Sequence, residues 1–170
     1  PGNHDVNRQT ISSAAEIVIG SLHSPEAVNE ILSSDQDRRL ILSKFNHYSE
    51  FVNSYFEGHL TFSDKKYFYV RHLDLANRRV AVLGLNSAWS SADDRDFRSL
   101  ALGKEQVREA LERSHQADVR VALLHHPLDW LMEFDRYDCG ALLLQECDFV
   151  LHGHLHNTGI RAPRAPNRRA

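Results

Sequence analysis

The spacing of apolar residues predicts two helices in the first third of the chain. Ser24 followed by Pro25 is the pattern of a helix start, and it predicts a helix over Glu26–Leu32. Between residues 36 and 55, apolar residues recur every three or four positions, which predicts one longer helix with a core-facing side. That side is formed by Leu40, Ile41, Phe45, Tyr48, Phe51, Val52 and Tyr55.

Strands and helices alternate in the rest of the chain. The runs Tyr67–Leu73 and Val80–Leu85 flank a polar segment and predict an antiparallel hairpin. The elements predicted after it are a helix over Lys104–His115, a buried strand over Val119–Leu124, a short helix over Asp138–Gln145 and a buried strand over Asp148–Leu151. This order is typical of a layered α/β domain with a mixed sheet.

The composition indicates one globular domain and limits its partners. The chain has 170 residues, of which 42% are hydrophobic, enough for a sizeable core. Its net charge of -3 does not favour nucleic acid as a partner. No apolar run approaches the roughly 20 residues of a membrane span, and no secretory signal is visible, so we expect a cytoplasmic protein without a membrane partner. Cys139 and Cys147 are too few for a four-cysteine zinc site and are expected to be buried thiols.

Three short motifs rich in histidine carry the candidate chemistry. They are Gly2-Asn3-His4-Asp5, His125-His126-Pro127 and His152-Gly153-His154-Leu155-His156. The last two follow predicted strands directly, and strand ends are the usual place for ligands in α/β sheets. Imidazole nitrogens and an amide oxygen suit Zn, Mn, Fe, Ni or Co. We therefore expect a metal site at one edge of the sheet.

In this order, the three motifs resemble the third, fourth and fifth of the five sequence blocks of the calcineurin-like metallophosphoesterase superfamily. Two segments between them, Leu83–Ser87 and Leu102–Gln106, are similar to segments of its bacterial phosphodiesterase-like members. The resemblance covers roughly residues 1–157. It implies the calcineurin-like phosphoesterase fold, a layered α/β sandwich. It also implies a dinuclear metal centre that hydrolyses small-molecule phosphomonoesters or phosphodiesters.

The resemblance further implies a role for individual motif residues. His4 would act as general acid or stabilise the transition state, and Asp5 would orient it through a hydrogen bond. Two divalent ions about 3.5–4 Å apart can activate a bridging hydroxide and neutralise phosphoryl charge. The implied ligands are Asn3, His125 and His154 for the second ion and His156 for the first.

The family's first two blocks, which supply the other ligands of the first ion and the aspartate that bridges both ions, do not occur in the chain. We therefore expect residues 1–157 to form an N-terminally truncated domain that is inactive alone and holds at most one ion weakly. The absent strands would leave unpaired sheet edges and exposed apolar faces. Residues 158–170, rich in proline and arginine, are expected to be a disordered tail. The resemblance also implies fusion to a larger signalling protein.

The same residues support two other interpretations of the function. The chain could be a catalytically inactive regulatory or scaffolding module derived from this fold. It could instead be a mononuclear zinc hydrolase that uses Asn3 and the three ligand histidines. We interpret His126 and His152 as structural, whereas Asn86 either lines the site or closes a turn.

Overall fold

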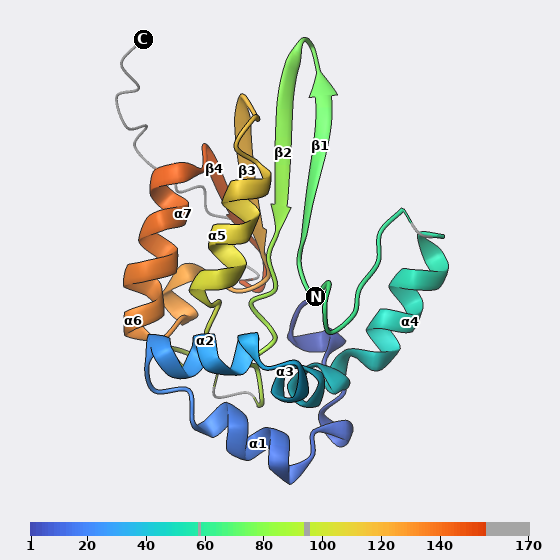
Figure 1. The fold of residues 1–170 in the computed structure, drawn as a ribbon, viewed down its shortest axis with the longest axis vertical. Helices are drawn as coiled ribbons and strands as arrows, with labels where there is room; N and C mark the ends of the chain where they lie inside the picture. Colours follow the sequence, from blue (N-terminus) through green and yellow to red (C-terminus); the bar gives the residue numbers. More distant parts are fainter. Residues whose placement is uncertain (58, 94–95, 156–170) are drawn as a thin grey trace.

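Helices and one four-stranded sheet form an α/β structure (Figure 1). It is a computed structural model that describes residues 1–57, 59–93 and 96–155. The predicted ligand His156 and the predicted tail at residues 158–170 lie outside this part of the chain. None of the helices that it describes has both the length and the apolar character needed to span a membrane.

The sheet is mixed, as the sequence predicts. Its strands are β1 (Tyr69–Leu75), β2 (Arg78–Gly84), β3 (Val119–Leu124) and β4 (Phe149–His152), in the spatial order β1-β2-β3-β4. Strands β1 and β2 pair antiparallel, whereas β2, β3 and β4 are parallel. The carboxyl ends of the three parallel strands therefore meet at one edge of the sheet, near the N-terminus (Figure 1).

The predicted hairpin is confirmed, with a tighter turn than the polar segment suggests. Leu75 pairs with Arg78, so only Ala76 and Asn77 connect the two strands. Both connecting residues have positive φ angles, 49° and 65°. Two consecutive residues of this kind match the right-handed twist of paired strands. The strands consequently continue through the polar residues that separate the two predicted runs.

Of the first two helices, α2 is predicted from the sequence and α1 is not. The predicted helix after Ser24 is α2 (Pro25–Ser33), and the Ser24 hydroxyl accepts a hydrogen bond at its start. The preceding helix, α1 (Ser13–Gly20), has no corresponding prediction. Its apolar residues are mostly adjacent in sequence, and Ile17 is 74% exposed. Without a regular apolar period, the pattern does not reveal this helix.

The prediction of a single helix between residues 36 and 55 is wrong. The segment is divided into α3 (Asp35–Leu42), a 3-10 turn at Ser43–Phe45 and α4 (Asn46–Tyr55). Because a 3-10 turn has a different pitch, it changes the direction in which the following side chains point. The predicted apolar side is accordingly lost at its end, where Phe51 and Tyr55 are 55% and 68% exposed.

The 3-10 turn buries a lysine. Lys44 is 2% exposed, and its ammonium group donates a hydrogen bond to the backbone carbonyl of Ser91. Burial lowers the pKa of Lys44 to about 7, and the nearby Asp96 carboxylate opposes this effect in part. The folded chain therefore loses the proton of Lys44 at a much lower pH than an exposed lysine would.

We expect the free energy of unfolding to rise with pH above pH 7 because of Lys44. Between pH 7 and its ordinary pKa of 10.5, the unfolded chain binds a proton that the folded chain lacks. This difference adds up to about 1.4 kcal/mol per pH unit. Lys44→Met should abolish the rise in urea unfolding curves recorded at several pH values. The exposed Lys66→Met should keep it, and a rise of equal size in Lys44→Met would contradict the assignment.

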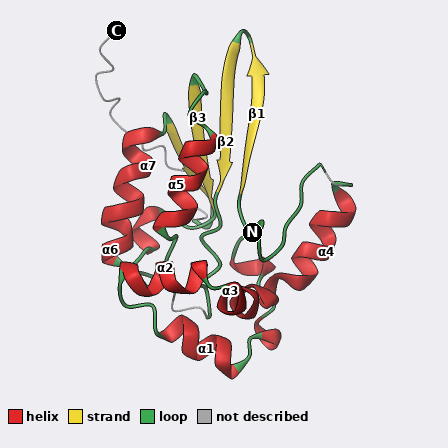
Figure 2. Cartoon of the chain, viewed as in Figure 1, coloured by secondary structure: helices red, strands yellow, loops and turns green. Residues whose placement is uncertain are grey.

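The second half of the chain supplies the helices that cover one face of the sheet (Figure 2). The predicted helix after residue 103 is confirmed as α5 (Lys104–Arg113), which buries Val107 and Ala110. The predicted short helix is part of a longer helical segment. That segment consists of α6 (Glu133–Asp135), a π turn at Arg136–Gly140 and α7 (Ala141–Glu146). Further 3-10 turns lie at Asn3–Asp5, Arg8–Thr10 and Leu128–Trp130.

The two cysteines are free and buried, as predicted. Burial raises the pKa of both thiols, that of Cys147 to about 11. A thiol with a raised pKa is protonated at neutral pH and therefore a poor nucleophile and metal ligand. Neither cysteine is a candidate for the chemistry of the site.

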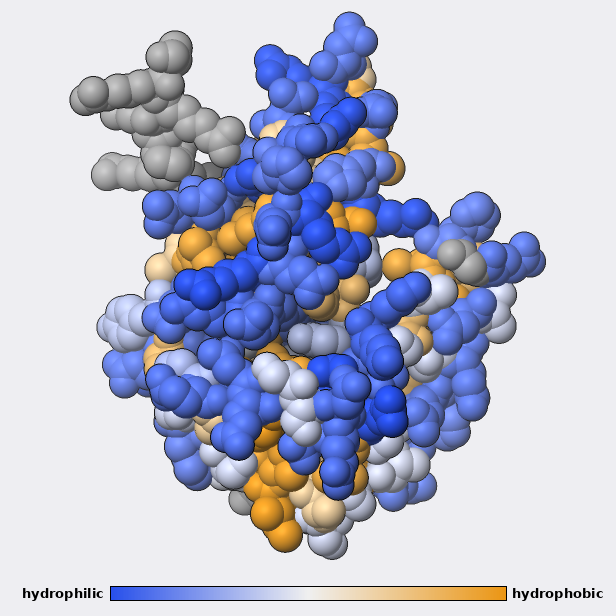
Figure 3. All heavy atoms as spheres, in the orientation of Figure 1, coloured by the Kyte–Doolittle hydropathy of each residue, from blue (hydrophilic) through white to orange (hydrophobic). Residues whose placement is uncertain are grey.

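The sheet face opposite α5 and α7 is apolar and partly exposed. Register places Val80 beside Val119, Val121 beside Phe149 and Leu123 beside Leu151, so these side chains share this face. Phe149 and Leu151 are 52% and 50% exposed. The prediction of a buried final strand is therefore wrong for β4. By contrast, the side of the molecule that α5 and α7 cover is largely hydrophilic (Figure 3).

We expect this open face to drive self-association of the chain. Leu151→Lys should weaken self-association about tenfold, because it removes an apolar side chain of the size that contributes this much when buried. Sedimentation velocity across a concentration series would measure the change. Ile17→Lys is the matched control, since it removes an exposed apolar residue from α1 instead. Equal effects of both substitutions would show that association does not depend on the open face.

Candidate metal centre

The candidate site lies where strands β3 and β4 end. His125 and His126 directly follow β3, and His154 lies two residues beyond the end of β4. Asn3 comes from the 3-10 turn at the N-terminal end. Backbone hydrogen bonds from the Gly153 N–H to the carbonyls of Leu124 and His125 connect the two strand ends. Parallel pairing of β3 and β4 thus brings residues from distant parts of the sequence together.

Three of the four predicted metal ligands converge. The Nε2 atom of His125 is 2.8 Å from the Oδ1 atom of Asn3. It is also 3.2 Å from the Nδ1 atom of His154. The fourth predicted ligand, His156, lies outside the described residues. Asn3, His125 and His154 therefore present one oxygen and two nitrogen atoms to a common point.

A fourth side chain, His126, joins this group, although the sequence pattern favours a structural role for it. Its ring is 1% exposed, and its Nδ1 atom is 3.0 Å from the hydroxyl of Ser87. The Ser87 hydroxyl also accepts the backbone N–H of His126. The Nε2 atom of His126 is buried without a hydrogen-bond partner. The potential ligand atoms of His125, His126 and His154 all lie within 4.8 Å of one another.

Burial favours the neutral form of two imidazoles of the cluster, those of His125 and His126. Burial lowers the pKa of His125, and the neighbouring His154 lowers it further. Burial, followed by the effects of His125 and His154, lowers the pKa of His126 to about 3. Only a neutral imidazole has a nitrogen lone pair to offer to a metal ion. The environment thus favours the protonation state that metal binding requires.

Local backbone geometry positions two of the histidine rings. Gly2 packs so closely against His125 that a Cβ atom at this position would lie 2.4 Å from the Nδ1 atom of the ring. His154 has a φ angle of 64°, and the Leu155 N–H bonds to the Gly153 carbonyl across it. Such a tight turn at a residue other than glycine is strained. The strain is a cost of directing the His154 ring toward His125.

One tryptophan covers the cluster. The centroid of the Trp130 indole is 4.2 Å from that of the His154 ring, in an edge-on arrangement. The same indole stacks on His126 with 5.8 Å between the centroids. It comes from the 3-10 turn after β3, where Leu100 and Leu131 form a bridge between loops. Trp130 therefore restricts the rotation of two potential ligands.

The two predicted catalytic residues are exposed, and the contact predicted between them is absent. The Asp5 carboxylate accepts a hydrogen bond from the Gly2 N–H at 2.8 Å. It makes no hydrogen bond to His4, because the 3-10 turn folds the carboxylate back onto the start of the motif. Asp5 therefore stabilises the turn that carries Asn3 rather than the ring of His4.

Asn86 closes a turn, as one of its two interpretations predicts. Its Oδ1 atom accepts the Ala88 N–H, and its backbone pairs with the side chain of Gln106. The neighbouring Ser87 is the residue that reaches the site, through His126. The sequence contains no signal for this contact, because a serine after a strand is common in turns.

Comparisons of the chain with protein-family models, with curated proteins and with solved structures found no match.

Proposed function

We propose that this chain forms part of a metal-dependent phosphoesterase that cleaves small-molecule phosphomonoesters or phosphodiesters. The observation that carries the proposal is the convergence of Asn3 with His125 and His154 across 122 and 29 positions of sequence. These are three ligands that the resemblance to calcineurin-like metallophosphoesterases implies for one metal ion. They also lie at strand ends of a mixed α/β sheet, where such a site is expected.

The cluster fits a divalent metal ion in its chemistry and its protonation. One amide oxygen and several neutral imidazoles form a donor set for Zn, Mn, Fe, Ni or Co. The buried and unpartnered Nε2 atom of His126 would gain a partner, which removes an unfavourable buried polar group. A bound ion would supply positive charge to offset the charge that develops on the phosphoryl oxygens. We propose His126 as a further ligand beside Asn3, His125 and His154.

Other side chains would hold the ligands in place and supply a proton. The Nε2–H of His125 now donates a hydrogen bond to the Asn3 oxygen, so metal binding through Nε2 would require the neutral tautomer with its proton on Nδ1. Ser87 holds the His126 ring through its Nδ1 side, which leaves the Nε2 side toward the cluster. His4, exposed on the turn that carries Asn3, would donate a proton to the leaving alkoxide.

The proposal extends to the fold of the complete domain. In the layered sandwich that the resemblance implies, a second sheet would pack on the open face that carries Phe149 and Leu151. The exposure of this face supports such a layer. The first ion of the proposed dinuclear centre would take His156 and further ligands that this chain does not supply.

Hydrolysis of 4-nitrophenyl phosphate and bis(4-nitrophenyl) phosphate tests the function. The assay uses this chain and the protein encoded by the complete reading frame, each with Mn²⁺ or Zn²⁺. We expect turnover by the complete protein, and its loss in His4→Ala with unchanged metal content. The exposed His115→Ala serves as a control. Metal binding without hydrolysis in the complete protein would favour the inactive regulatory module.

A further inference from the structure

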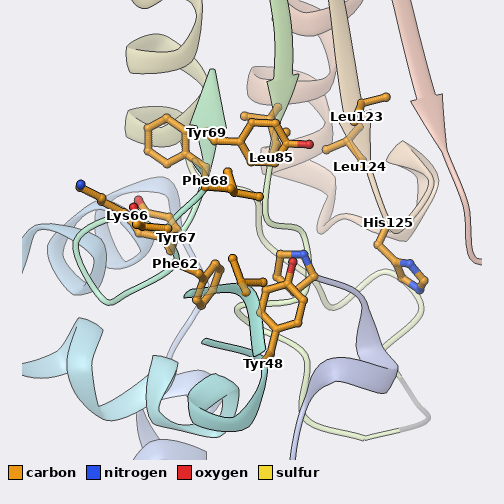
Figure 4. A pocket seen from close by; sticks show the side chains of 15 residues that line it. Tyr48, Phe62, Lys66, Tyr67, Phe68, Tyr69, Leu85, Leu123, Leu124 and His125 are labelled. Carbon is orange, nitrogen blue, oxygen red and sulfur yellow. The ribbon is translucent and has the colours of Figure 1, made fainter. Parts of the chain in front are cut away.

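An aromatic cavity of about 240 Å³ borders the histidine cluster. It lies where β2 and β3 end, and its wall includes Leu124 and His125. Figure 4 shows His125 at one side of the cavity, Tyr48 and Phe62 on a second side and Tyr69 with Leu85 opposite them. His125 thus belongs both to the cavity wall and to the proposed metal centre.

We propose that this cavity binds a single aromatic ring carried by the phosphate ester that the site cleaves. The inference rests on the proposed function, because the histidine cluster would place the phosphate. A ring attached to that phosphate would extend past His125 into the cavity. The substrate class is therefore an aryl phosphate ester rather than a simple alkyl one.

The rings of the cavity wall are held by contacts with one another. Tyr48 and Phe62 meet edge to face, with centroids 5.1 Å apart and planes at 88°. Phe62 makes a second edge-to-face contact with Phe45 at 5.6 Å. Side chains fixed in this way lose little conformational freedom when they bind a further ring. The wall is consequently a preformed surface for aromatic contacts.

Tyr69 completes the wall because Gly84 leaves room for it. A Cβ atom at position 84 would lie 2.1 Å from the Cζ atom of the Tyr69 ring. The ring therefore lies directly against the backbone of β2, at its junction with the site. Any larger residue at this position would push the Tyr69 ring from its place.

The size and charge of the cavity favour one neutral ring. Pockets that enclose drug-sized ligands have volumes of roughly 300–1,000 Å³, so about 240 Å³ is suited to a smaller group. The lining residues include no aspartate or glutamate, and the lysine among them, Lys66, is exposed. The amino group of Pro1 also lines the cavity, and burial lowers its pKa, which favours the uncharged form. Five of the lining residues are aromatic, namely Tyr48, Phe62, Tyr67, Phe68 and Tyr69.

Phenol binding to the metal-free chain tests the cavity independently of hydrolysis. With EDTA present, we expect saturable binding by proton NMR and nuclear Overhauser contacts from the phenol ring to Phe62 and Tyr69. Cyclohexanol, which has the same size and hydroxyl group but no aromatic face, should bind about tenfold more weakly. Equal affinities, or contacts only to other residues, would overturn the proposal.

A matched pair of tyrosines on α4 provides the variants. Tyr48→Ala should weaken phenol binding about tenfold, whereas Tyr55→Ala, which lies outside the cavity wall and is 68% exposed, should not change it. If Tyr48→Ala does not fold, the Overhauser contacts of the unaltered chain decide the question. If the unaltered chain binds phenol but no metal ion, the proposed function is refuted and the cavity proposal stands. Absence of phenol binding would refute the cavity alone.

Discussion

Replacing His154 with alanine is expected to lower the affinity of the chain for Zn²⁺ or Co²⁺ by at least about 100-fold. Substitution of residues that merely support a metal ligand commonly costs 10- to 100-fold in affinity, so removal of a ligand should cost more. The His154 Nδ1 atom is 3.2 Å from the Nε2 atom of His125, close enough for both nitrogens to bind the same ion. Calorimetric titration and the visible absorption of bound Co²⁺ would measure the change.

The same variant should lose the stabilisation that metal binding confers. A ligand that binds only the folded chain adds about 2.7 kcal/mol to the free energy of unfolding at a concentration 100 times its dissociation constant. His152→Ala is the matched control, because this exposed imidazole lies two residues away and bonds to the Gly153 carbonyl instead. Unaltered affinity in His154→Ala, or equal losses in both variants, would exclude the proposed centre.

The sequence predicts strand β3 and the meeting of two histidine motifs at strand ends most closely. Strand β3 is predicted at its observed bounds, because its continuous apolar run has no competing pattern. The convergence of His125 and His154 is also predictable, whereas the place of Asn3 beside them is implied only by the resemblance. Parallel strands place their carboxyl ends together, and each of the two strands ends in a histidine motif.

The residues that the sequence misplaces depend on contacts beyond the local pattern. His126 adjoins a predicted ligand, but whether its ring turns inward depends on Ser87, 39 positions earlier. The break between α3 and α4 occurs where Lys44 is buried against the carbonyl of Ser91. Apolar periodicity cannot reveal either contact, since both join segments that are far apart in the chain.

The exposure of β4 has a related cause. An apolar strand indicates that some surface covers it, and the apolar run at residues 149–151 is as hydrophobic as a buried strand. Which surface covers the strand depends on how the layers of the fold pack, and the sequence of the strand does not specify this. In the described part of the chain, helices α5 and α7 cover one face of the sheet, and on the other face Phe149 and Leu151 of β4 are left exposed.

Gly2 offers the most specific test of how the site is built, because it lies against a proposed ligand without being one. A Cβ atom there would lie 2.4 to 2.7 Å from three ring atoms of His125, including Cγ at the base of the ring. The base of a ring cannot yield by a small rotation, so the whole side chain must move. That movement would break the 2.8 Å contact between His125 and Asn3.

We therefore expect Gly2→Ala to lower metal affinity about 10- to 100-fold, as substitutions beside a ligand commonly do, although no ligand atom is removed. Gly20→Ala is the control, since a Cβ atom at that position of α1 meets no atom within 4 Å. Calorimetry with Zn²⁺ measures both variants, and circular dichroism verifies that each is folded. If Gly2→Ala binds Zn²⁺ as tightly as Gly20→Ala, the position of the His125 ring does not determine metal binding, and the site must be formed by other atoms.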